Sequence, residues 1–455
     1  MQRKGIVIAG LAGGSGKSVV AVGLAAALRR RGRRVVPFKK GPDYIDAGWL
    51  QLAAGEKCYN LDPFLMSGEA IADSFNRRSR GADIVIVEGN RGLFDGVNAD
   101  GGYSTADLAL TLDLPVVLVV NCTKTTRTVA AMVLGCQMFD ERLDIRGVIL
   151  NQIATERQRL LVTEAVEKYT GIPVIGSVPR LKRDIFPMRH LGMVPHQEYT
   201  DSDGALAYLA DLIAENVDLD RLEEVMATIP ESPSIAGAAA DKIVQAKVRI
   251  GILQDAAFQF YYSENLEALE RAGAELVYID AMRDPALPEI AGLYIGGGFP
   301  ETGARELAAN TSFRQSIRQA ADRGLPIYAE CGGLIYLGRS IILDGEEFPL
   351  AGVFPVQFGM SKKPQAHGYT IFQVERNNAF YALGAEVKGH EFRYSKVLDW
   401  QGADDQLVLK MVRGNGFAGG RDGLVYNNVL ALYTHVHADG TPEWAENFMR
   451  RCRHE

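Results

Sequence analysis

The stretch that most constrains the fold lies at the amino end, where an apolar run leads directly into a glycine-rich turn. "GIVIAGLA" (residues 5–12) predicts a short buried strand, "GGSGKS" (13–18) follows it, and "SVVAVGLAAALRRRG" (18–32) predicts a helix. A strand, a turn with Gly-Lys-Ser and a helix are the structural context of a phosphate-binding P-loop. Backbone N–H groups of such a turn converge on phosphate oxygens, and the amino end of the helix adds a favourable dipole. We therefore expect an α/β fold with a nucleotide site.

Five positions of this turn are candidates for binding the nucleotide and its metal ion. Gly13, Gly14 and Gly16 supply backbone that phosphate oxygens can approach closely, because glycine has no side chain. Lys17 would reach the β and γ phosphates, and Ser18 would hold Mg²⁺ through its hydroxyl. The expected cofactors are ATP and Mg²⁺.

The turn departs from the P-loop pattern G-x-x-x-x-G-K-[ST] at one position. The first glycine of the pattern falls on Leu11, and Gly10 stands one place early. A glycine-rich turn with a purely structural role is one alternative. A P-loop switch protein of the ParA or Mrp type is another, but such proteins carry an extra lysine early in the loop, where this chain has Ala12.

Strand-like and helix-like runs alternate through the first half of the chain. Further apolar runs of strand length cover residues 34–39, 83–89, 115–121, 146–152 and 173–179. Continuous apolar strands separated by helices predict a parallel sheet that is covered on both faces. We expect this P-loop domain to extend over residues 1–225.

A shift in composition predicts the domain boundary. Residues 226–246 are rich in Ala, Pro and Ser and have no steady period, which is typical of a linker. A second α/β pattern follows, with apolar runs at 248–254, 275–280, 292–298 and 326–333, a helix at 263–273 and strand pairs within 423–440. We expect a second α/β domain over residues 247–455.

Charged residues follow two of the predicted strands, at the ends where open parallel sheets bind their ligands. The two stretches are "FKKGPDYIDAGW" (38–49) and "VEGNRGLFDG" (87–96). A Mg–nucleotide site needs carboxylates at such positions, so we expect both loops to face the P-loop. The candidate side chains are Lys39, Lys40, Asp43, Asp46, Glu88 and Asp95. Each carboxylate could instead lie in a solvated loop or cap a helix.

Cys331 is the cysteine whose sequence context indicates reactivity. In "YAECGGLIYLG" (328–338) it follows an apolar run and precedes two glycines, a strand–elbow–helix pattern that exposes a nucleophile. "LYTHVHADG" supplies His435 and His437 as candidate bases. "YIGGGFPE" (294–301) supplies a glycine nest that suits an oxyanion. The alternative is a cysteine that only packs as a small hydrophobic residue.

Composition and charge exclude several classes of protein. The five cysteines include no Cys-x-x-Cys pair, which argues against a disulfide framework or zinc site and indicates a reducing compartment. The net charge of −7 argues against general nucleic-acid binding, and the basic run at residues 29–34 suits a solvated helix end. No apolar segment is long enough to span a membrane and no signal peptide is evident, so we expect a cytoplasmic protein.

The chain resembles the cobyrinic acid a,c-diamide synthase family over nearly its whole length. The resemblance rests on "PFKKGPDYID", "VEGNRGLFDG", "DAAFQFYYSENLEALERAGAELV", "YIGGGFPE", "AECGGLIYLG" and "GHEFRYS", in this order and spacing. Members of the family are carbon–nitrogen ligases that amidate tetrapyrrole carboxylates with glutamine. The resemblance implies a P-loop domain similar to dethiobiotin synthetase, followed by a glutaminase domain of the class I glutamine amidotransferase type.

The reaction that this resemblance implies has two parts. Cys331, with His435 as its base, attacks the side-chain amide of glutamine and releases ammonia, then glutamate, through a thioester. MgATP phosphorylates a peripheral carboxylate of the macrocycle, and ammonia displaces phosphate from the acyl phosphate. The expected partners are glutamine and an anionic tetrapyrrole, without nucleic acid or membrane, and a homodimer is compatible with the sequence.

The resemblance also implies roles for single residues. The implied sets are Lys39 at the nucleotide, Ser18, Asp46 and Glu88 at the metal, Asp43, Tyr44 and Asp95 at the substrate carboxylate, and Gly297 and Gly298 at the oxyanion. His390 and Glu391 of "GHEF" line the substrate cleft or form a structural turn. His437 stands where many class I glutaminases carry a glutamate, so the third member of the triad is left open.

Two departures from the family pattern concern the substrate. Asn121, followed by "CTKTTRT", stands where the family usually shows an acidic residue, while Lys40 and Lys124 add cations near the expected substrate cleft. These changes leave amidation intact but leave the macrocycle open. Cobyrinate or its metal-free relative hydrogenobyrinate is the main expectation, and sirohaem and nickel-sirohydrochlorin are the alternatives.

Overall fold

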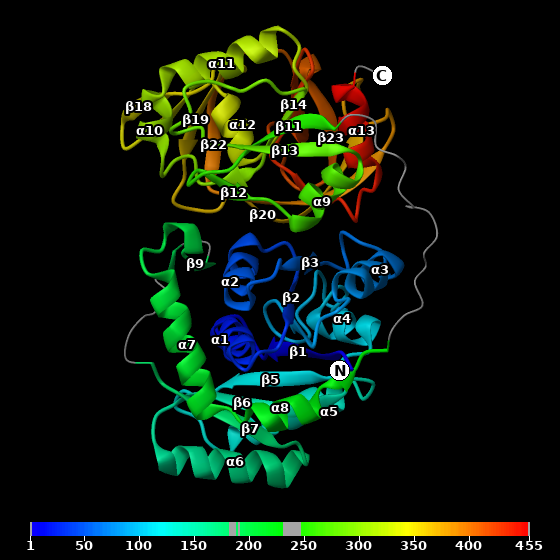
Figure 1. Cartoon of the computed structure of the whole chain (residues 1–455), viewed down its shortest axis with the longest axis vertical. Helices are drawn as coiled ribbons and strands as arrows, with labels where there is room; N and C mark the ends of the chain where they lie inside the picture. The colour runs from blue at the N-terminus through cyan, green and yellow to red at the C-terminus, as the bar shows by residue number, and fades with distance from the viewer. Residues whose placement is uncertain (1, 182–187, 190–191, 231–246, 454–455) are drawn as a thin grey trace. The chain divides into compact units, whose positions relative to one another are not determined.

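The computed structural model describes residues 2–181, 188–189, 192–230 and 247–453. The chain forms two compact units, Met1–Ile235 and Ala236–Glu455 (Figure 1). Most of the predicted linker, residues 226–246, lies outside the described residues.

The first unit contains a parallel sheet with the strand order β3-β2-β4-β1-β5-β6-β7, and β10 pairs with β1 in the antiparallel direction. Its strands are β1 (Lys4–Gly10), β2 (Val35–Lys40), β3 (Tyr59–Leu61), β4 (Ile84–Glu88), β5 (Val116–Asn121), β6 (Ile145–Ile153), β7 (Val174–Pro179) and β10 (Ala227–Thr228). Ile6, Val7 and Ile8 of β1 are fully buried, so both faces of the central strand are covered. The predicted parallel sheet is confirmed.

The helices of the first unit connect these strands and cover the sheet. They are α1 (Lys17–Arg30), α2 (Tyr44–Ala54), α3 (Gly68–Arg78), α4 (Thr105–Leu112), α5 (Thr128–Phe139), α6 (Glu156–Thr170), α7 (Ser202–Asn216) and α8 (Leu219–Val225). A short 3-10 helix, η1 (His196–Glu198), and the two-residue strands β8 (Met188–Arg189) and β9 (Gly192–Met193) precede α7. Because parallel strands are joined by crossover helices, the loops after β1, β2 and β4 all meet at the carboxyl edge of the sheet.

The second unit is built around a larger mixed sheet with the strand order β13-β11-β14-β16-β25-β24-β23-β20-β21-β26. The strands from β13 to β25 in that order are parallel, and the following pairs are antiparallel. The strands are β11 (Val248–Leu253), β13 (Ala274–Ile279), β14 (Gly292–Ile295), β16 (Ile327–Glu330), β20 (Ala366–Val374), β21 (Glu386–Arg393), β23 (Leu407–Arg413), β24 (Arg421–Tyr426), β25 (Val429–Leu432) and β26 (His435–Val436).

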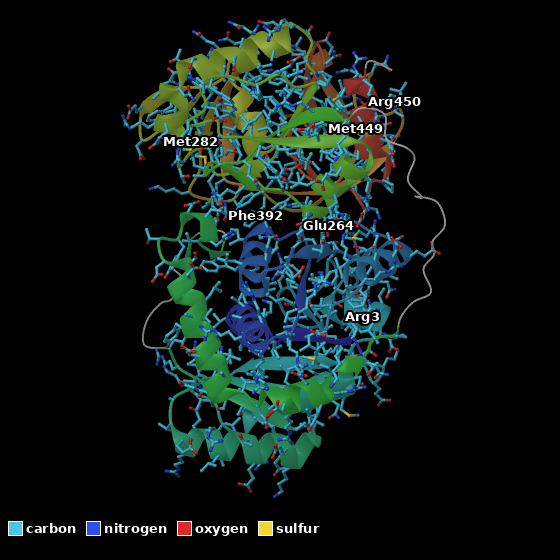
Figure 2. The ribbon with its side chains drawn as sticks, in the orientation of Figure 1. Arg3, Glu264, Met282, Phe392, Met449 and Arg450 are labelled. Atoms are coloured by element: carbon cyan, nitrogen blue, oxygen red, sulfur yellow. The ribbon has the colours of Figure 1, made fainter. Side chains whose placement is uncertain are left out.

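Two smaller sheets and several helices complete the second unit. The sheets are β12 (Phe258–Phe260) with β15 (Gly297–Gly298), and β18 (Glu346–Pro349), β17 (Ser340–Leu343), β19 (Val356–Met360) and β22 (Ser395–Trp400). The helices are α9 (Ser263–Arg271), α10 (Ala304–Ala309), α11 (Thr311–Asp322), α12 (Gly332–Leu337), α13 (Glu443–Cys452) and the 3-10 helix η2 (Asp404–Gln406). Side chains fill the interior of each unit (Figure 2).

Two predicted strands of the second unit are shorter in the structure. The run at residues 292–298 divides into β14 and β15, because the Gly296 amide donates to the Tyr261 hydroxyl (2.8 Å) while β15 pairs with β12. The run at residues 326–333 ends as a strand at Glu330, where the chain turns sharply into α12. In the described part of the chain, none of the helices is long and apolar enough to cross a membrane.

Candidate active sites of the two units

The P-loop lies between β1 and α1, and its glycines adopt conformations that other residues would strain. Gly14 and Gly16 have φ values of 75° and 87°. At Gly16 a Cβ atom would lie 2.0 Å from the Asn151 amide nitrogen, which donates to the Ser15 carbonyl at 2.9 Å. At Gly13 a Cβ would meet no atom within 4 Å, so the backbone there is open to a ligand. The first predicted strand therefore ends at a glycine loop whose exposed backbone suits a phosphate.

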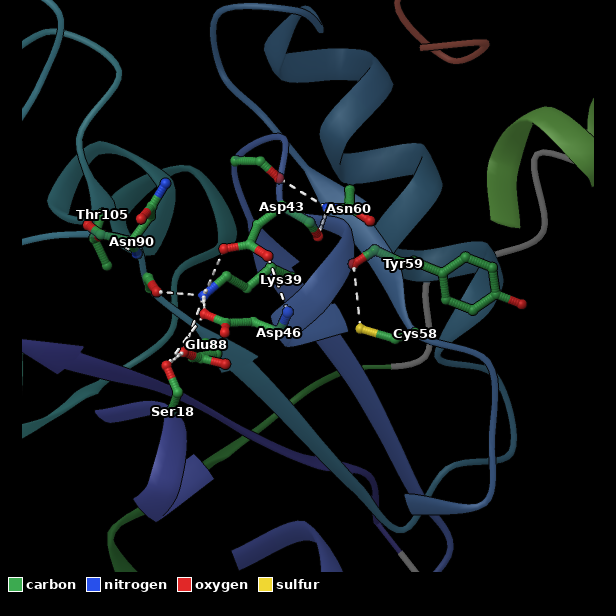
Figure 3. Close-up of polar contacts among 12 residues, drawn as sticks. Ser18, Lys39, Asp43, Asp46, Cys58, Tyr59, Asn60, Glu88, Asn90 and Thr105 are labelled. Atoms are coloured by element: carbon green, nitrogen blue, oxygen red, sulfur yellow. Dashed lines mark hydrogen bonds and ion pairs between the residues drawn. The ribbon is translucent and has the colours of Figure 1, made fainter. Parts of the chain in front are cut away.

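Lys39 is the centre of a charged cluster beside this loop. The register of β2 and β4 places Lys39 opposite Glu88 at the carboxyl edge of the sheet. The Lys39 ammonium lies 2.9 Å from Glu88 Oε1 and 2.6 Å from Asp46 Oδ2, and Ser18 Oγ lies 2.6 and 3.1 Å from the same two atoms (Figure 3). Asp43 caps α2 by accepting from the Asp46 amide, and its Oδ2 lies 3.9 Å from the Lys39 ammonium. The structure thus brings together five sequence-predicted residues.

Burial and mutual charge set the protonation of this cluster. Burial alone would lower the pKa of Lys39, but Asp46 and Glu88 outweigh it and hold that pKa above its ordinary value. Burial and the positive Lys39 lower the pKa of Lys17. Burial and the neighbouring Asp46 raise the pKa of Asp43 to about 7. Burial opposes ionisation of Asp46 as well, yet Lys39 keeps its pKa below the usual range. An ionised Asp46–Lys39 pair therefore stands beside an Asp43 that titrates near neutrality.

The donor atoms at this site fit a magnesium ion bound with a nucleotide. Mg²⁺ prefers oxygen ligands and usually takes one or two carboxylates together with phosphates and water. Ser18 Oγ, Asp46 and Glu88 converge here, and Glu88 Oε2 is buried without a hydrogen-bond partner among the described residues. Within the same part of the chain, no group of three or more His, Cys, Asp or Glu side chains could hold a metal by itself. The arrangement suits a metal that also needs nucleotide oxygens.

The loop after β4 lies against the P-loop, as the sequence predicts. The Leu93 amide donates to the Gly10 carbonyl at 2.7 Å, and a Cβ at Gly92 would lie 2.6 Å from the Leu11 carbonyl. Asp95 is exposed, and its Oδ2 accepts from the Gly92 amide at 2.8 Å, which closes a tight turn. Tyr44 is half-buried as the first residue of α2, next to Asp43. Of the predicted substrate residues, Asp43 joins the charged cluster, while Asp95 holds the shape of its own loop.

Cys331 stands at a sharp elbow between β16 and α12. Its backbone has φ 46° and ψ −96°, a conformation that an L-residue rarely adopts. Such strain is kept only where the surrounding structure enforces it, and it clusters at functional sites. The Cys331 amide donates to the Leu432 carbonyl at 2.8 Å, so the main chain of β25 holds the elbow in place. The predicted strand–elbow–helix context of the cysteine is present.

His435 and the glycine segment adjoin this elbow. Burial would lower the pKa of His435, but the adjacent Cys331 and Glu330 raise it to about 10. A Cβ at Gly297 would lie 2.4 Å from His435 Cε1, and a Cβ at Gly332 would lie 3.0 Å from the Gly298 amide nitrogen. His435 therefore packs against Gly297, and Gly332, the residue after Cys331, packs against Gly298. The geometry allows a thiolate–imidazolium pair next to backbone donors.

His437 takes a different environment from His435. Its Nε2 lies 3.7 Å from Glu264 Oε1, and its ring packs against Tyr262 at 4.6 Å between centroids. His390 pairs with His435 across β21 and β26, and their rings stack at 4.8 Å. Residues 386–393 form strand β21, so the alternative of a turn at "GHEF" is wrong.

Sequence reasoning missed Glu330, the residue directly before the cysteine. Glu330 Oε2 lies 3.4 Å from His435 Nδ1 and accepts from the Tyr294 hydroxyl at 3.2 Å. The available signal was the strand "IYAE" itself, because a carboxylate that ends a buried apolar strand is costly unless it has a partner.

Comparison with known proteins assigns each half to a described domain. Residues 6–191 match the family model of the "CobQ/CobB/MinD/ParA nucleotide binding domain", and residues 249–443 match that of the "CobB/CobQ-like glutamine amidotransferase domain". Among solved structures, "Structure of PurLQS from Thermotoga maritima" matches 46% of this chain and 99% of its own, at 19% identity and a TM-score of 0.35. The family assignment rests on the sequence matches.

Curated relatives match the chain from end to end. The cobyrinate a,c-diamide synthase of Magnetococcus marinus is 42% identical over 444 residues, which are 96% of this chain and 95% of that protein. Those of Archaeoglobus fulgidus and Picrophilus torridus are 39% and 40% identical, over 98% and 99% of this chain and 97% and 99% of their own lengths. Matches of this length favour an amide-forming enzyme over a P-loop switch protein. The chain belongs to the cobyrinate a,c-diamide synthase family.

Proposed function

We propose that the protein amidates the a and c carboxylates of cobyrinate, or of metal-free hydrogenobyrinate, with glutamine as nitrogen donor and ATP as energy source. The observation that carries this proposal is the presence of two half-sites in one chain. One is a bare P-loop beside an oxygen-rich charged cluster, and the other is a strained Cys331 in contact with His435. The macrocycle follows from the relatives that match over nearly their full length, which are cobyrinate a,c-diamide synthases.

The glutaminase half, residues 247–455, frees ammonia. The Cys331 thiol gives its proton to His435, and the thiolate attacks the amide carbon of glutamine. The Gly297 and Gly298 segment donates backbone hydrogen bonds to the oxygen of the tetrahedral intermediate. His435 returns the proton to the departing nitrogen, ammonia leaves, and water hydrolyses the thioester to glutamate. The raised pKa of His435 supports this step, because it favours the imidazolium that the transfer creates.

The synthetase half, residues 1–225, converts a carboxylate into an acyl phosphate that ammonia attacks. Gly13, Gly14 and Gly16 hold the phosphates of ATP with Lys17, and Lys39 orients Asp46 and Glu88 by direct contact. Bound Mg²⁺ would be held by Ser18, Asp46 and Glu88 and would neutralise phosphate charge. Asp43, with a pKa near neutrality, and Tyr44 lie on the substrate side of this cluster in our proposal.

A panel of macrocycles tests the substrate. Purified protein is incubated with glutamine, MgATP and one of four compounds, and products are identified by mass spectrometry. The four are cobyrinate, hydrogenobyrinate, sirohaem and nickel-sirohydrochlorin. We expect two amide substitutions on cobyrinate or hydrogenobyrinate. Amidation of sirohaem or nickel-sirohydrochlorin alone would keep the mechanism but replace the substrate. These two compounds are included because Asn121 and Lys124, which depart from the family pattern, are exposed.

A further inference from the structure

Glu330 is a buried carboxylate that lies beside the histidine of the cysteine site. Its side chain is 1% exposed, and it ends an otherwise apolar strand. Oε1 accepts from the Val436 amide at 3.1 Å, and Oε2 lies 3.2 Å from the Tyr294 hydroxyl and 3.4 Å from His435 Nδ1. Burial of a carboxylate costs several kcal/mol unless charge and hydrogen bonds offset it. His435 supplies the charge, and its neighbour Val436 supplies a hydrogen bond.

We propose that Glu330 is the positioning residue that completes the Cys331–His435 pair. This inference deepens the proposed function and rests on it. Cys331 and Glu330 are consecutive, so the elbow that places the thiol beside His435 also places the carboxylate 3.4 Å from His435 Nδ1. The same β26 backbone that carries His435 is held to Glu330 through Val436. One dipeptide therefore fixes both ends of the imidazole.

The carboxylate acts on His435 in two ways. When Nδ1–H donates to Glu330, Nε2 is left without a proton and can accept the one from the thiol. When that proton arrives, the negative Glu330 stabilises the imidazolium while the thiolate forms. No further proton donor or acceptor is required. The proton moves from Sγ to Nε2 and then to the amide nitrogen of glutamine, which leaves as ammonia.

Other groups face the same imidazole and bear on its titration. Cys331 lies at one nitrogen, His390 of β21 stacks on the ring, and the charge of Glu391 interacts with His435 from the same strand. His437, two residues after His435, stands where many class I glutaminases carry a glutamate, and it contacts Glu264 of α9. The Glu264–His437 pair thus offers a matched control: a second buried carboxylate beside a histidine in the same unit.

The experiment compares Glu330→Gln, Glu330→Asp and Glu264→Gln in the full-length chain. Glutamate release from glutamine gives kcat and KM, and alkylation of Cys331 by iodoacetamide across pH, followed by mass spectrometry, reports the thiolate. We expect Glu330→Gln to lower kcat about 10²-fold with KM nearly unchanged, and to move the alkylation midpoint upward by about one pH unit. Glu330→Asp should recover part of both, and Glu264→Gln should leave both close to wild type.

Two results would overturn the inference. One is a wild-type kcat and alkylation midpoint in Glu330→Gln, with or without an effect of Glu264→Gln. The other is loss of the cooperative thermal transition in both Glu330 variants, which would assign the residue to folding alone. Absence of glutamate release by the wild-type protein would instead contradict the proposed function, so the two failures are distinguishable.

Discussion

Lys39 shows how one buried charge can organise a site. It is fully buried, it contacts Asp46 and Glu88 within hydrogen-bond distance, and it also reaches the Gly89 carbonyl at 3.3 Å. Without that ammonium, two carboxylates would stand side by side in a desolvated pocket. Lys39 offsets the repulsion and the desolvation of these two carboxylates. Their negative charge in turn raises the pKa of Lys39 although the ammonium is buried.

Replacement of Lys39 by Met should therefore destabilise the first unit strongly. Loss of one partner of a buried ion pair leaves uncompensated charge, and we expect the free energy of unfolding to fall by about 3–5 kcal/mol. Arg30→Met is the matched control, because Arg30 makes a 2.6 Å ion pair with Asp211 at the surface, where such pairs contribute about 0–1 kcal/mol. Denaturant unfolding without nucleotide measures both, and equal effects of the two variants would contradict the assigned role of Lys39.

Replacement of Cys331 by Ala should separate the two nitrogen sources. Glutamine-driven amidation should fall about 10³-fold or more, because the nucleophile is lost, whereas ammonium-driven amidation should remain near wild type. Cys452, which is buried but lies on α13 with a pKa raised to about 12 by burial, supplies the control substitution Cys452→Ala. If Cys331→Ala lost both glutamine-driven and ammonium-driven amidation while Cys452→Ala kept both, Cys331 would be a structural residue.

The secondary structure elements divide into those that local sequence predicts and those that it does not. The β1–P-loop–α1 segment was predictable because apolar runs and glycines act locally. The elbow at Cys331 was predictable for the same reason. The partner of His435 was not, because Glu330 reaches it only through the register of β16, β25, β21 and β26, which distant segments of the chain establish together. The break between β14 and β15 likewise depends on Tyr261.

Strand β21 allows a test of stability against pH. Burial, followed by the nearby Asp422, raises the pKa of Glu391 to about 7, while its Oε1 accepts from the Gly416 amide at 2.8 Å. The unfolded chain loses this proton near the ordinary pKa of about 4.3, so between that pH and 7 the folded state binds more protons. The Glu391 contribution to the free energy of unfolding is therefore fully present below pH 4 and falls as pH rises to 7.

Glu391→Gln should remove that slope, because glutamine keeps the acceptor oxygen and does not ionise. We expect the variant to gain on the order of 1–3 kcal/mol relative to wild type between pH 5 and pH 8. Thermal unfolding at matched pH values measures the difference. A constant difference across this range would contradict a raised pKa at Glu391.

The whole chain joins two units that each have their own core and their own chemistry. The first buries its apolar residues around β1 and α1, and the second around the mixed sheet. Each half-site is assembled from elements of one unit: the charged cluster from β2, β4, α1 and α2, and the cysteine site from β15, β16 and β26. Damage confined to one half-site should therefore leave the chemistry of the other in place.

Lys17→Ala tests this independence from the side opposite to Cys331→Ala. Lys17 is the first residue of α1 and is 8% exposed, and its loss removes the cation expected at the β and γ phosphates. We expect amide synthesis to fall about 10²-fold or more with glutamine and with ammonium alike, while glutamate release continues. Chelation of Mg²⁺ by EDTA in the wild-type protein should reproduce the same pattern, and added Mg²⁺ should reverse only the chelation. If Lys17→Ala kept wild-type amide synthesis, the P-loop would not take part in the reaction, because the acyl phosphate would form without its lysine.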